Sequence, residues 1–225
     1  MNNAYGEIIS ILIKENINTW NSYISHNFVQ QLADGTLQNI QFLKYLKQDY
    51  IFLIHFARAW ALATVKAENL EEMTFTSSIM NSLIEDEMEL HRKICAREGI
   101  GKIELENTIE EPENLAYTRY VLEIGFSGDF LDLIIALSPC VIGYGIIGNK
   151  LKKIAKSDKY IEWINTYSSQ DYQNLCISVA KFIDDSVVRR LGVNYQDTGK
   201  WDRLIWNFHK ATKLETKFWD MGLNV

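Results

Sequence analysis

Apolar residues recur at three- and four-residue intervals along almost the whole chain, which is the spacing of one face of an α-helix. No stretch sustains the alternation of apolar and polar residues that a half-buried strand shows. Helices with such apolar faces bury them against one another. The sequence therefore predicts an all-α bundle of about seven or eight helices.

The first half of the chain contains three long periodic segments. The first predicts a helix over Ala4–Ser22. After the turn signal DGT at positions 34–36, the segment IQFLKYLKQDYIFLIHFARAWALATVKA is far too long for a strand and predicts a second helix. The third segment predicts a helix over Glu71–Arg97.

In the second half, prolines, glycines and capping residues predict where helices begin and end. Pro112 suits the first turn of a helix that continues through ENLAYTRYVLEIGF. The run SGDFLDLIIALSPCVIGYGIIGNKLKKI predicts either one helix kinked at Pro139 or two helices that meet there. A short helix is expected in SDKYIEWINTY, and a longer one in SSQDYQNLCISVAKFIDDSVVRRL that stops at Gly192. The last helix is expected to begin near Asp197 or Thr198.

Composition favours one domain over residues 1–225. Hydrophobic residues make up 47% of the chain, enough for a substantial core, and the two prolines and 12 glycines leave few places for a linker. The net charge is −6 and the lysines and arginines are scattered, so we expect no nucleic-acid partner. The amino-terminal segment lacks a basic region and is interrupted by charges, so we expect neither a signal peptide nor a membrane span.

The three cysteines, Cys95, Cys140 and Cys176, are odd in number and form no CxxC pair. This usage predicts a cytoplasmic protein with free thiols and no structural zinc. Cys95 and Cys176 are expected to be structural, because neither has an evident carboxylate partner.

Ionisable residues on faces that should be buried are the candidates for chemistry, because an unpaired buried charge is costly. Tyr45, Asp49, Phe52 and Phe56 share one helix face, so Asp49 is a carboxylate among aromatic rings. Two interpretations stay open for Asp49. It is either functional or paired with a lysine or arginine of a neighbouring helix.

Glu215 is a second carboxylate on an aromatic face, in a series that steps along the last helix as Trp201, Ile205, Phe208, Thr212, Glu215 and Trp219. Such surroundings would raise its pKa and suit it to acid–base work. The alternative is a solvated residue near the chain end, paired with Lys213 or Lys217.

Cys140 is the third candidate, and it shares a face with Leu137 and Tyr144. A free cysteine in such a position is usually a core residue. Pro139 directly before it favours function, because a new helix starting there would lower the pKa of the thiol.

Glu87 and His91 lie one turn apart, as metal ligands on one helix can, but a di-metal site needs further ligands on facing helices. No second pair of this kind is evident in the sequence, so a metal site is not expected.

Six blocks of the sequence resemble the TenA/thiaminase II family, and they occur in the family's order over nearly the whole chain. The blocks are HNFVQQLADGTLQNIQFLKYLKQDYIFLIHFAR (26–58), EMELHR (87–92), YTRYVL (117–122), LSPCVIGYGIIG (137–148), YIEWINTYSS (160–169) and ETKFWDM (215–221). The resemblance implies a single-domain haem-oxygenase-like helical bundle. It also implies a homotetramer that needs no metal or organic cofactor.

The family resemblance also implies a reaction, the hydrolysis of 4-amino-5-aminomethyl-2-methylpyrimidine, and in some members of thiamin, to 4-amino-5-hydroxymethyl-2-methylpyrimidine in thiamin salvage. By motif, Cys140 matches the nucleophile, Glu215 the acid/base, and Asp49 the carboxylate that holds the pyrimidine. The pocket residues that contact the ring match Phe52, Tyr117, Tyr144 and Tyr167.

The sequence departs from the family at Phe52, where members often carry a tyrosine whose hydroxyl approaches the cysteine. Tyr50 lies on another helix face and cannot replace it. A non-catalytic pyrimidine-binding protein is therefore one alternative. A haem-oxygenase-like di-iron oxygenase using Glu87 and His91 is another.

Overall fold

The computed structural model describes residues 5–224, except for the side chain of residue 86. These residues group into two compact units. Unit 1 comprises the described residues up to Leu37 together with Ile134–Trp219, and unit 2 comprises Gln38–Leu133 together with the described residues after Trp219. No strand occurs in the part of the chain described, so the all-α prediction is confirmed. The expectation of a single domain stays a prediction.

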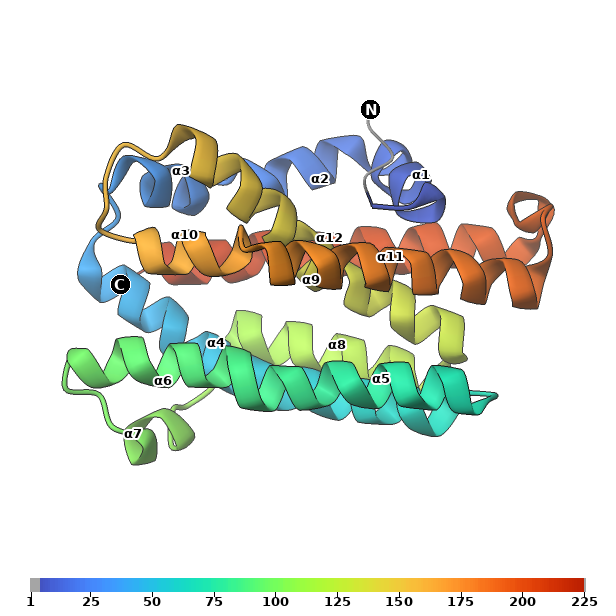
Figure 1. Cartoon of the computed structure of the whole chain (residues 1–225), viewed down its shortest axis with the longest axis horizontal. Coiled ribbons are helices and arrows are strands. Elements are labelled where there is room, and N and C mark those ends of the chain that lie inside the picture. The colour runs from blue at the N-terminus through green and yellow to red at the C-terminus, as the bar shows by residue number, and fades with distance from the viewer. Residues whose placement is uncertain (1–4, 225) are drawn as a thin grey trace. The chain divides into compact units, whose positions relative to one another are not determined.

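Unit 2 is built around one long helix, α4 (Asn39–Lys66), as the sequence predicts. The remaining elements of the unit are α5 (Leu70–Ser82), the π-helical turn η1 (Leu83–Glu87), α6 (Met88–Arg97), α7 (Lys102–Glu106) and α8 (Pro112–Ser127). Figure 1 shows α5 and α6 following one another along α4, with α7 near the end of α6.

Local signals explain several helix starts in unit 2. Pro112 occupies the first turn of α8, as predicted, because its missing N–H has no helical partner there in any case. Asn69 caps α5 by accepting a hydrogen bond from the Glu72 backbone N–H at 2.9 Å. The single helix predicted over Glu71–Arg97 is wrong in one respect, because η1 interrupts it. The short α7 is not predicted by the sequence pattern.

Unit 1 contains α1 (Glu7–Glu15), α2 (Ile17–Ile24), α3 (Asn27–Asp34), most of α9 (Phe130–Ile154), α10 (Ile161–Tyr167), α11 (Gln170–Leu191), η2 (Tyr195–Asp197) and all but the last turn of α12 (Gly199–Leu223). Counting both units, the described residues form twelve α-helices, so the predicted number of seven or eight is too low. The surplus consists mainly of short helices, whose periodicity is too brief to separate them from their neighbours.

The prediction of a single helix over Ala4–Ser22 is wrong, because two helices, α1 and α2, occupy this range. Ala4 lies outside the described residues. Asn16 ends α1, and its side-chain amide donates to the Leu12 carbonyl at 2.9 Å. Asparagine competes for backbone hydrogen bonds in this way and so favours helix ends. Towards the other end of the chain Gly192, with φ 80°, ends α11 as predicted, and Ser169 caps its start.

The apolar run with Pro139 is one continuous helix, α9, not two. Proline cannot donate the hydrogen bond that the Ile135 carbonyl would otherwise receive. The hydroxyl of Ser138 donates to that carbonyl instead, at 2.8 Å. The freed carbonyl is therefore satisfied inside the helix, and α9 continues through the proline.

Glycines in α9 let neighbouring elements of unit 1 approach its backbone closely. A Cβ at Gly148 would lie 2.5 Å from the backbone carbon of Tyr167, and a Cβ at Gly143 would lie 2.2 Å from the ring of Tyr23. Only glycine fits either contact. By length and composition α9 resembles a membrane span, but 94% of its most apolar stretch is buried inside the protein, as in the core helix of a globular protein.

Candidate functional site

The residues predicted for the site fall into two groups. Asp49, Phe52 and Tyr117 belong to unit 2, and so do Glu87 and His91. The other group, in unit 1, consists of Cys140, Tyr144, Tyr167 and Glu215. Each group has its own geometry.

Asp49 is almost fully buried on α4, with 3% of its surface exposed. The Tyr45 hydroxyl, one turn earlier, donates to its Oδ2 at 3.0 Å. Nε2 of His91 on α6 lies 2.7 Å from the same oxygen. The partner of Asp49 is therefore a histidine, and the predicted alternative of a lysine or arginine partner is wrong.

His91 is completely buried, and both of its ring nitrogens are engaged. Its Nδ1 lies 2.8 Å from the backbone carbonyl of Glu87, and because a carbonyl only accepts, Nδ1 must carry a proton. Burial by itself lowers the pKa of His91, but the hydrogen bond and charge of Asp49 outweigh it, with a further contribution from Glu87. The net result is a pKa above the ordinary histidine value, which favours the imidazolium form.

The pair Glu87 and His91 is thus not arranged as two metal ligands. Glu87 contacts the ring of His91 through its backbone carbonyl, and Asp49 occupies the other ring nitrogen. In the described part of the chain no three His, Cys, Asp or Glu residues cluster closely enough to hold a metal ion. The sequence singled out His91 only as a conceivable metal ligand and did not predict its contact with Asp49, because that contact joins positions 42 residues apart.

Phe52 and Tyr117 form an aromatic wall within unit 2. Phe52 lies one turn after Gln48, and its ring centroid is 4.9 Å from that of Tyr117 and 5.3 Å from that of Phe56. Asn114 on α8 donates to both the backbone and the side-chain carbonyl of Gln48, at 2.8 and 3.0 Å. These bonds fix α8 against α4 one turn before the two rings meet.

Cys140 lies in the middle of α9 with 9% of its surface exposed, and it forms no disulfide. Of the two predicted alternatives, one helix through Pro139 is confirmed, so Cys140 does not stand at a helix start where a dipole would act on its thiol. Cys95 in unit 2 is fully buried, which raises the pKa of its thiol to about 11. That thiol stays protonated at neutral pH, in keeping with the structural role predicted for it.

Aromatic rings of unit 1 surround Tyr144, one turn after Cys140. Its centroid lies 4.9 Å from Tyr167, 5.9 Å from Trp163 and 5.4 Å from Trp219. Trp163 and Trp219 are not among the site residues predicted from the sequence, although each lies in a block that carries the family resemblance.

Glu215 lies on α12 one turn before Trp219 and has 2% of its surface exposed. The alternative of a solvated position near the chain end is therefore wrong. Lys213 and Lys217, by contrast with Glu215, are exposed. A carboxyl group placed beside aromatic rings and away from water is suited to giving and taking protons.

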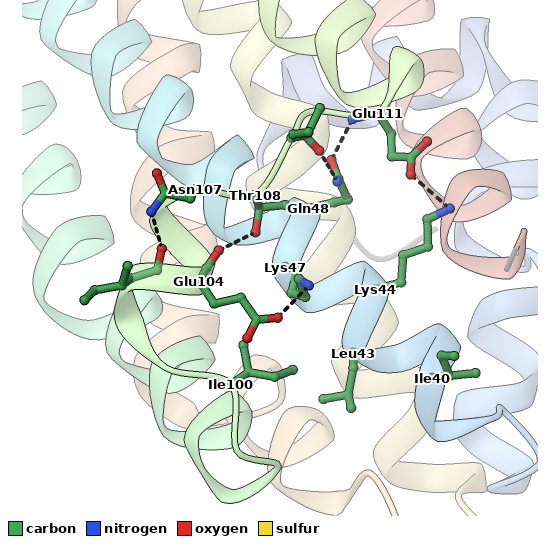
Figure 2. A pocket seen from close by; sticks show the side chains of 12 residues that line it. Ile40, Leu43, Lys44, Lys47, Gln48, Ile100, Glu104, Asn107, Thr108 and Glu111 are labelled. Atoms are coloured by element: carbon green, nitrogen blue, oxygen red, sulfur yellow. Dashed lines mark hydrogen bonds and ion pairs between the residues drawn. The ribbon is translucent and has the colours of Figure 1, made fainter.

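Unit 2 also has a surface groove of about 960 Å³, formed by the start of α4 and the segment from Ile100 to Glu111. Figure 2 shows its ion pairs, Lys47 with Glu104 at 2.9 Å and Lys44 with Glu111 at 3.3 Å. None of the predicted site residues lines this groove. Gln48 does, and it faces away from the neighbouring Asp49 along α4, so the groove is not the predicted site.

Comparisons with known proteins identify the family of the chain. A family model described as the TENA/THI-4/PQQC family matches residues 14–225. A relative from Halalkalibacterium halodurans, named aminopyrimidine aminohydrolase, is 36% identical over 91% of this chain and 90% of its own.

Solved structures are similar over almost the whole chain as well. One from a Silicibacter species, described as a TenA family transcription regulator, is 49% identical with a TM-score of 0.98, covering all of both chains. Another, from Shewanella denitrificans, is 13% identical with a TM-score of 0.71 over 94% of this chain and 90% of its own. It is described as a domain of unknown function with a heme oxygenase-like fold, and that fold is the one predicted here.

Proposed function

The chain belongs to the TENA/THI-4/PQQC family, and from that premise we propose that it is an aminopyrimidine aminohydrolase of thiamin salvage. It hydrolyses 4-amino-5-aminomethyl-2-methylpyrimidine to 4-amino-5-hydroxymethyl-2-methylpyrimidine and ammonia. Thiamin, which carries a thiazolium group in place of the amine, is a second candidate substrate. The observation that carries the proposal is the buried carboxylate of Asp49, which Tyr45 and His91 contact only through its Oδ2 oxygen.

Asp49 is proposed to bind the aminopyrimidine. The amino group of this ring donates hydrogen bonds, and the adjacent ring nitrogen does so once it is protonated. A buried carboxylate accepts such bonds strongly, because little water competes for them. Holding the protonated ring also makes it a better electrophile, which a neutral aminopyrimidine is not.

Cys140 is proposed as the nucleophile and Glu215 as the acid and base. The Cys140 sulfur adds to a ring carbon while a proton goes to the ring nitrogen, and the ring's electron pair then expels the amine as Glu215 protonates it. Water adds to the exocyclic carbon and returns a proton to Glu215. The sulfur then leaves and takes back the proton that its thiol gave to the ring nitrogen, and the aromatic ring is restored. The rings of Tyr144, Tyr167, Phe52 and Tyr117 are proposed to contact the pyrimidine.

The experiment that tests this function is incubation of the purified protein with 4-amino-5-aminomethyl-2-methylpyrimidine while ammonia release is followed. Ammonia together with the hydroxymethyl product supports the hydrolase. Calorimetric binding of the pyrimidine without ammonia release would identify the alternative, a non-catalytic binding protein. Metal analysis of the same sample separates both from a di-iron oxygenase.

The Silicibacter relative is described as a transcription regulator, which is a different class of function. A regulator that bound DNA directly would need clustered cations to follow the phosphates. This chain has a net charge of −6 with scattered lysines and arginines, which favours the enzyme. The homotetramer and the cytoplasmic location stay predictions; light scattering tests the first, with an expected mass of four chains of 26.1 kDa.

Phe52 stands where members of the family often have a tyrosine, so a substitution at this position tests whether the missing hydroxyl limits the rate of the proposed reaction. The Phe52→Tyr variant adds a hydroxyl to a buried ring, and we expect a few-fold gain in kcat because the hydroxyl would assist ionisation of the thiol. Steady-state kinetics measure it, with Phe56→Tyr as the matched control one turn along α4. No gain in kcat would mean that the thiol does not need this hydroxyl.

A further inference from the structure

The proposed reaction assigns no role to His91, although its side chain directly contacts the carboxylate proposed to bind substrate. His91 is fully buried on α6, and the 2.7 Å distance from its Nε2 to Asp49 Oδ2 is typical of a charge-assisted hydrogen bond. A buried ion pair is costly to build and is a poor device for stability alone. Its presence therefore calls for a functional account.

The hydrogen bonds fix where the proton of this pair lies. Nδ1 of His91 donates to the Glu87 carbonyl, so the contact between Nε2 and Oδ2 must contain a second proton. The Tyr45 hydroxyl donates to the same oxygen. Two donors thus converge on Oδ2, as expected of an ionised carboxylate beside an imidazolium. No hydrogen bond to Oδ1 occurs among the described residues.

The backbone before His91 supports this placement. The π-helical turn Leu83–Glu87 ends one turn earlier, and the carbonyl that holds Nδ1 belongs to its last residue. Turns of this kind are rare in helices and frequent at functional sites. The groups whose charges act on His91 are Asp49 on α4 and Glu87 on η1, and the Tyr45 hydroxyl donates to the same Asp49 oxygen. Cys95, one turn further along α6, stays an uncharged thiol.

We propose that His91 is a positioning residue for aminopyrimidine binding and acts through Asp49. Its ring lies against the Asp49 carboxylate, and together with Tyr45 it fixes Oδ2, so that Oδ1 is the oxygen that receives the pyrimidine. This inference rests on the proposed function, because Asp49 must bind the pyrimidine for His91 to matter.

The test is binding of the proposed product, 4-amino-5-hydroxymethyl-2-methylpyrimidine, measured by calorimetry so that no turnover is needed. His91→Gln keeps a neutral hydrogen-bond donor but no charge, and we expect it to weaken binding about tenfold or more. In the Asp49→Asn background the same change should alter affinity less than about twofold, because the two residues act as one unit. His55→Gln, a half-buried histidine of α4 in the same unit, is the matched control and should bind as the unchanged protein does.

The pH dependence provides a readout that a purely structural role would not change. His91 loses its charge as the pH rises through its raised pKa, so the advantage of the unchanged protein over His91→Gln should shrink on the alkaline side. Equal affinity of the two proteins at all pH values would overturn the inference. So would a loss of the same size in the Asp49→Asn background.

Two further results keep the test decisive. If His91→Gln does not fold, as judged by circular dichroism, Tyr45→Phe removes the other donor to Oδ2 and should weaken binding about threefold, but only when Asp49 is present. If Tyr45→Phe then bound the product as tightly as the unchanged protein does, the inference would be overturned. Failure of the unchanged protein itself to bind the product would instead refute the proposed function, and the two failures are thus distinguishable.

Discussion

The two groups of candidate residues differ in what holds their ionisable side chains. In unit 2, Asp49 is fixed by two polar partners on one of its oxygens, and a histidine balances its charge. In unit 1, Cys140 and Glu215 lie on helices crowded with aromatic rings, and α9 uses glycines to bring its neighbours close. Unit 2 therefore offers a pre-organised polar anchor, and unit 1 a tightly packed aromatic environment for a thiol and a carboxyl group.

This difference suggests that Asp49 serves mainly to bind the substrate and that Cys140 and Glu215 serve mainly in turnover. Single substitutions can separate the two effects. A charge-balanced carboxylate contributes mainly to binding, because it presents the same hydrogen bonds throughout the reaction. A nucleophile and a proton-transferring group contribute mainly to turnover. Variants of Asp49 and His91 should thus change affinity first, and variants of Cys140 and Glu215 should change rate first.

The largest effect is expected for Cys140→Ser. A serine hydroxyl is a far weaker nucleophile than a thiol at neutral pH, so kcat should fall by about a thousandfold or more. Binding of the hydroxymethyl product should stay within about threefold. Ammonia release and calorimetry measure the two, and Cys95→Ser is the control for a thiol with no proposed role. Unchanged hydrolysis by Cys140→Ser would remove the covalent mechanism.

Asp49→Asn should give the complementary result. It keeps the size of the side chain but removes the buried charge, and we expect product affinity to fall about a hundredfold because a charge-assisted hydrogen bond is lost. Calorimetry measures it. If kcat fell while product affinity stayed the same, the proposed division between binding by Asp49 and turnover by Cys140 and Glu215 would be wrong.

The close packing of unit 1 can be tested through stability. Gly148→Ala would place a Cβ 2.5 Å from the backbone of Tyr167, which cannot move aside as a side chain could. We expect it to lower the free energy of unfolding by about 1–3 kcal/mol, as measured by urea denaturation. Gly199→Ala is the matched control, since nothing lies within 4 Å of its Cβ, and a comparable loss there would refute the packing argument.

The smallest effect concerns the pH dependence of stability. Because the pKa of His91 is raised in the folded protein, its contribution to stability is complete below its ordinary unfolded value, about 6.5, and is lost as the pH rises through the folded value. The difference in unfolding free energy between the unchanged protein and His91→Gln should therefore be largest in mild acid.

Urea denaturation of both proteins at a series of pH values measures this dependence. His55→Gln is again the control. For this variant, the difference in unfolding free energy from the unchanged protein should grow as the pH rises, opposite to that for His91→Gln. Burial and the charge of Arg119 lower the pKa of His55, so its neutral form is favoured in the folded state. A His91→Gln difference that grew with rising pH would contradict the ion pair with Asp49.

Much of the fold could be predicted because its signals are local. The apolar period of α4, the proline that begins α8 and the glycine that ends α11 each act within a few residues. The same locality explains the errors. Asn16 divides a periodic segment through one side-chain bond, and a π-turn interrupts another with no evident sequence signal.

The sequence by itself determined the helical class, the family and the three side chains, one thiol and two carboxylates, that the proposed chemistry needs. Only the tertiary structure decided the surroundings of each. It showed that Asp49 is bound to His91, that Glu215 is buried and that Cys140 lies within a continuous helix. The physical reason is range: periodicity and caps depend on neighbours along the chain, whereas burial and charge pairing depend on residues brought together by folding.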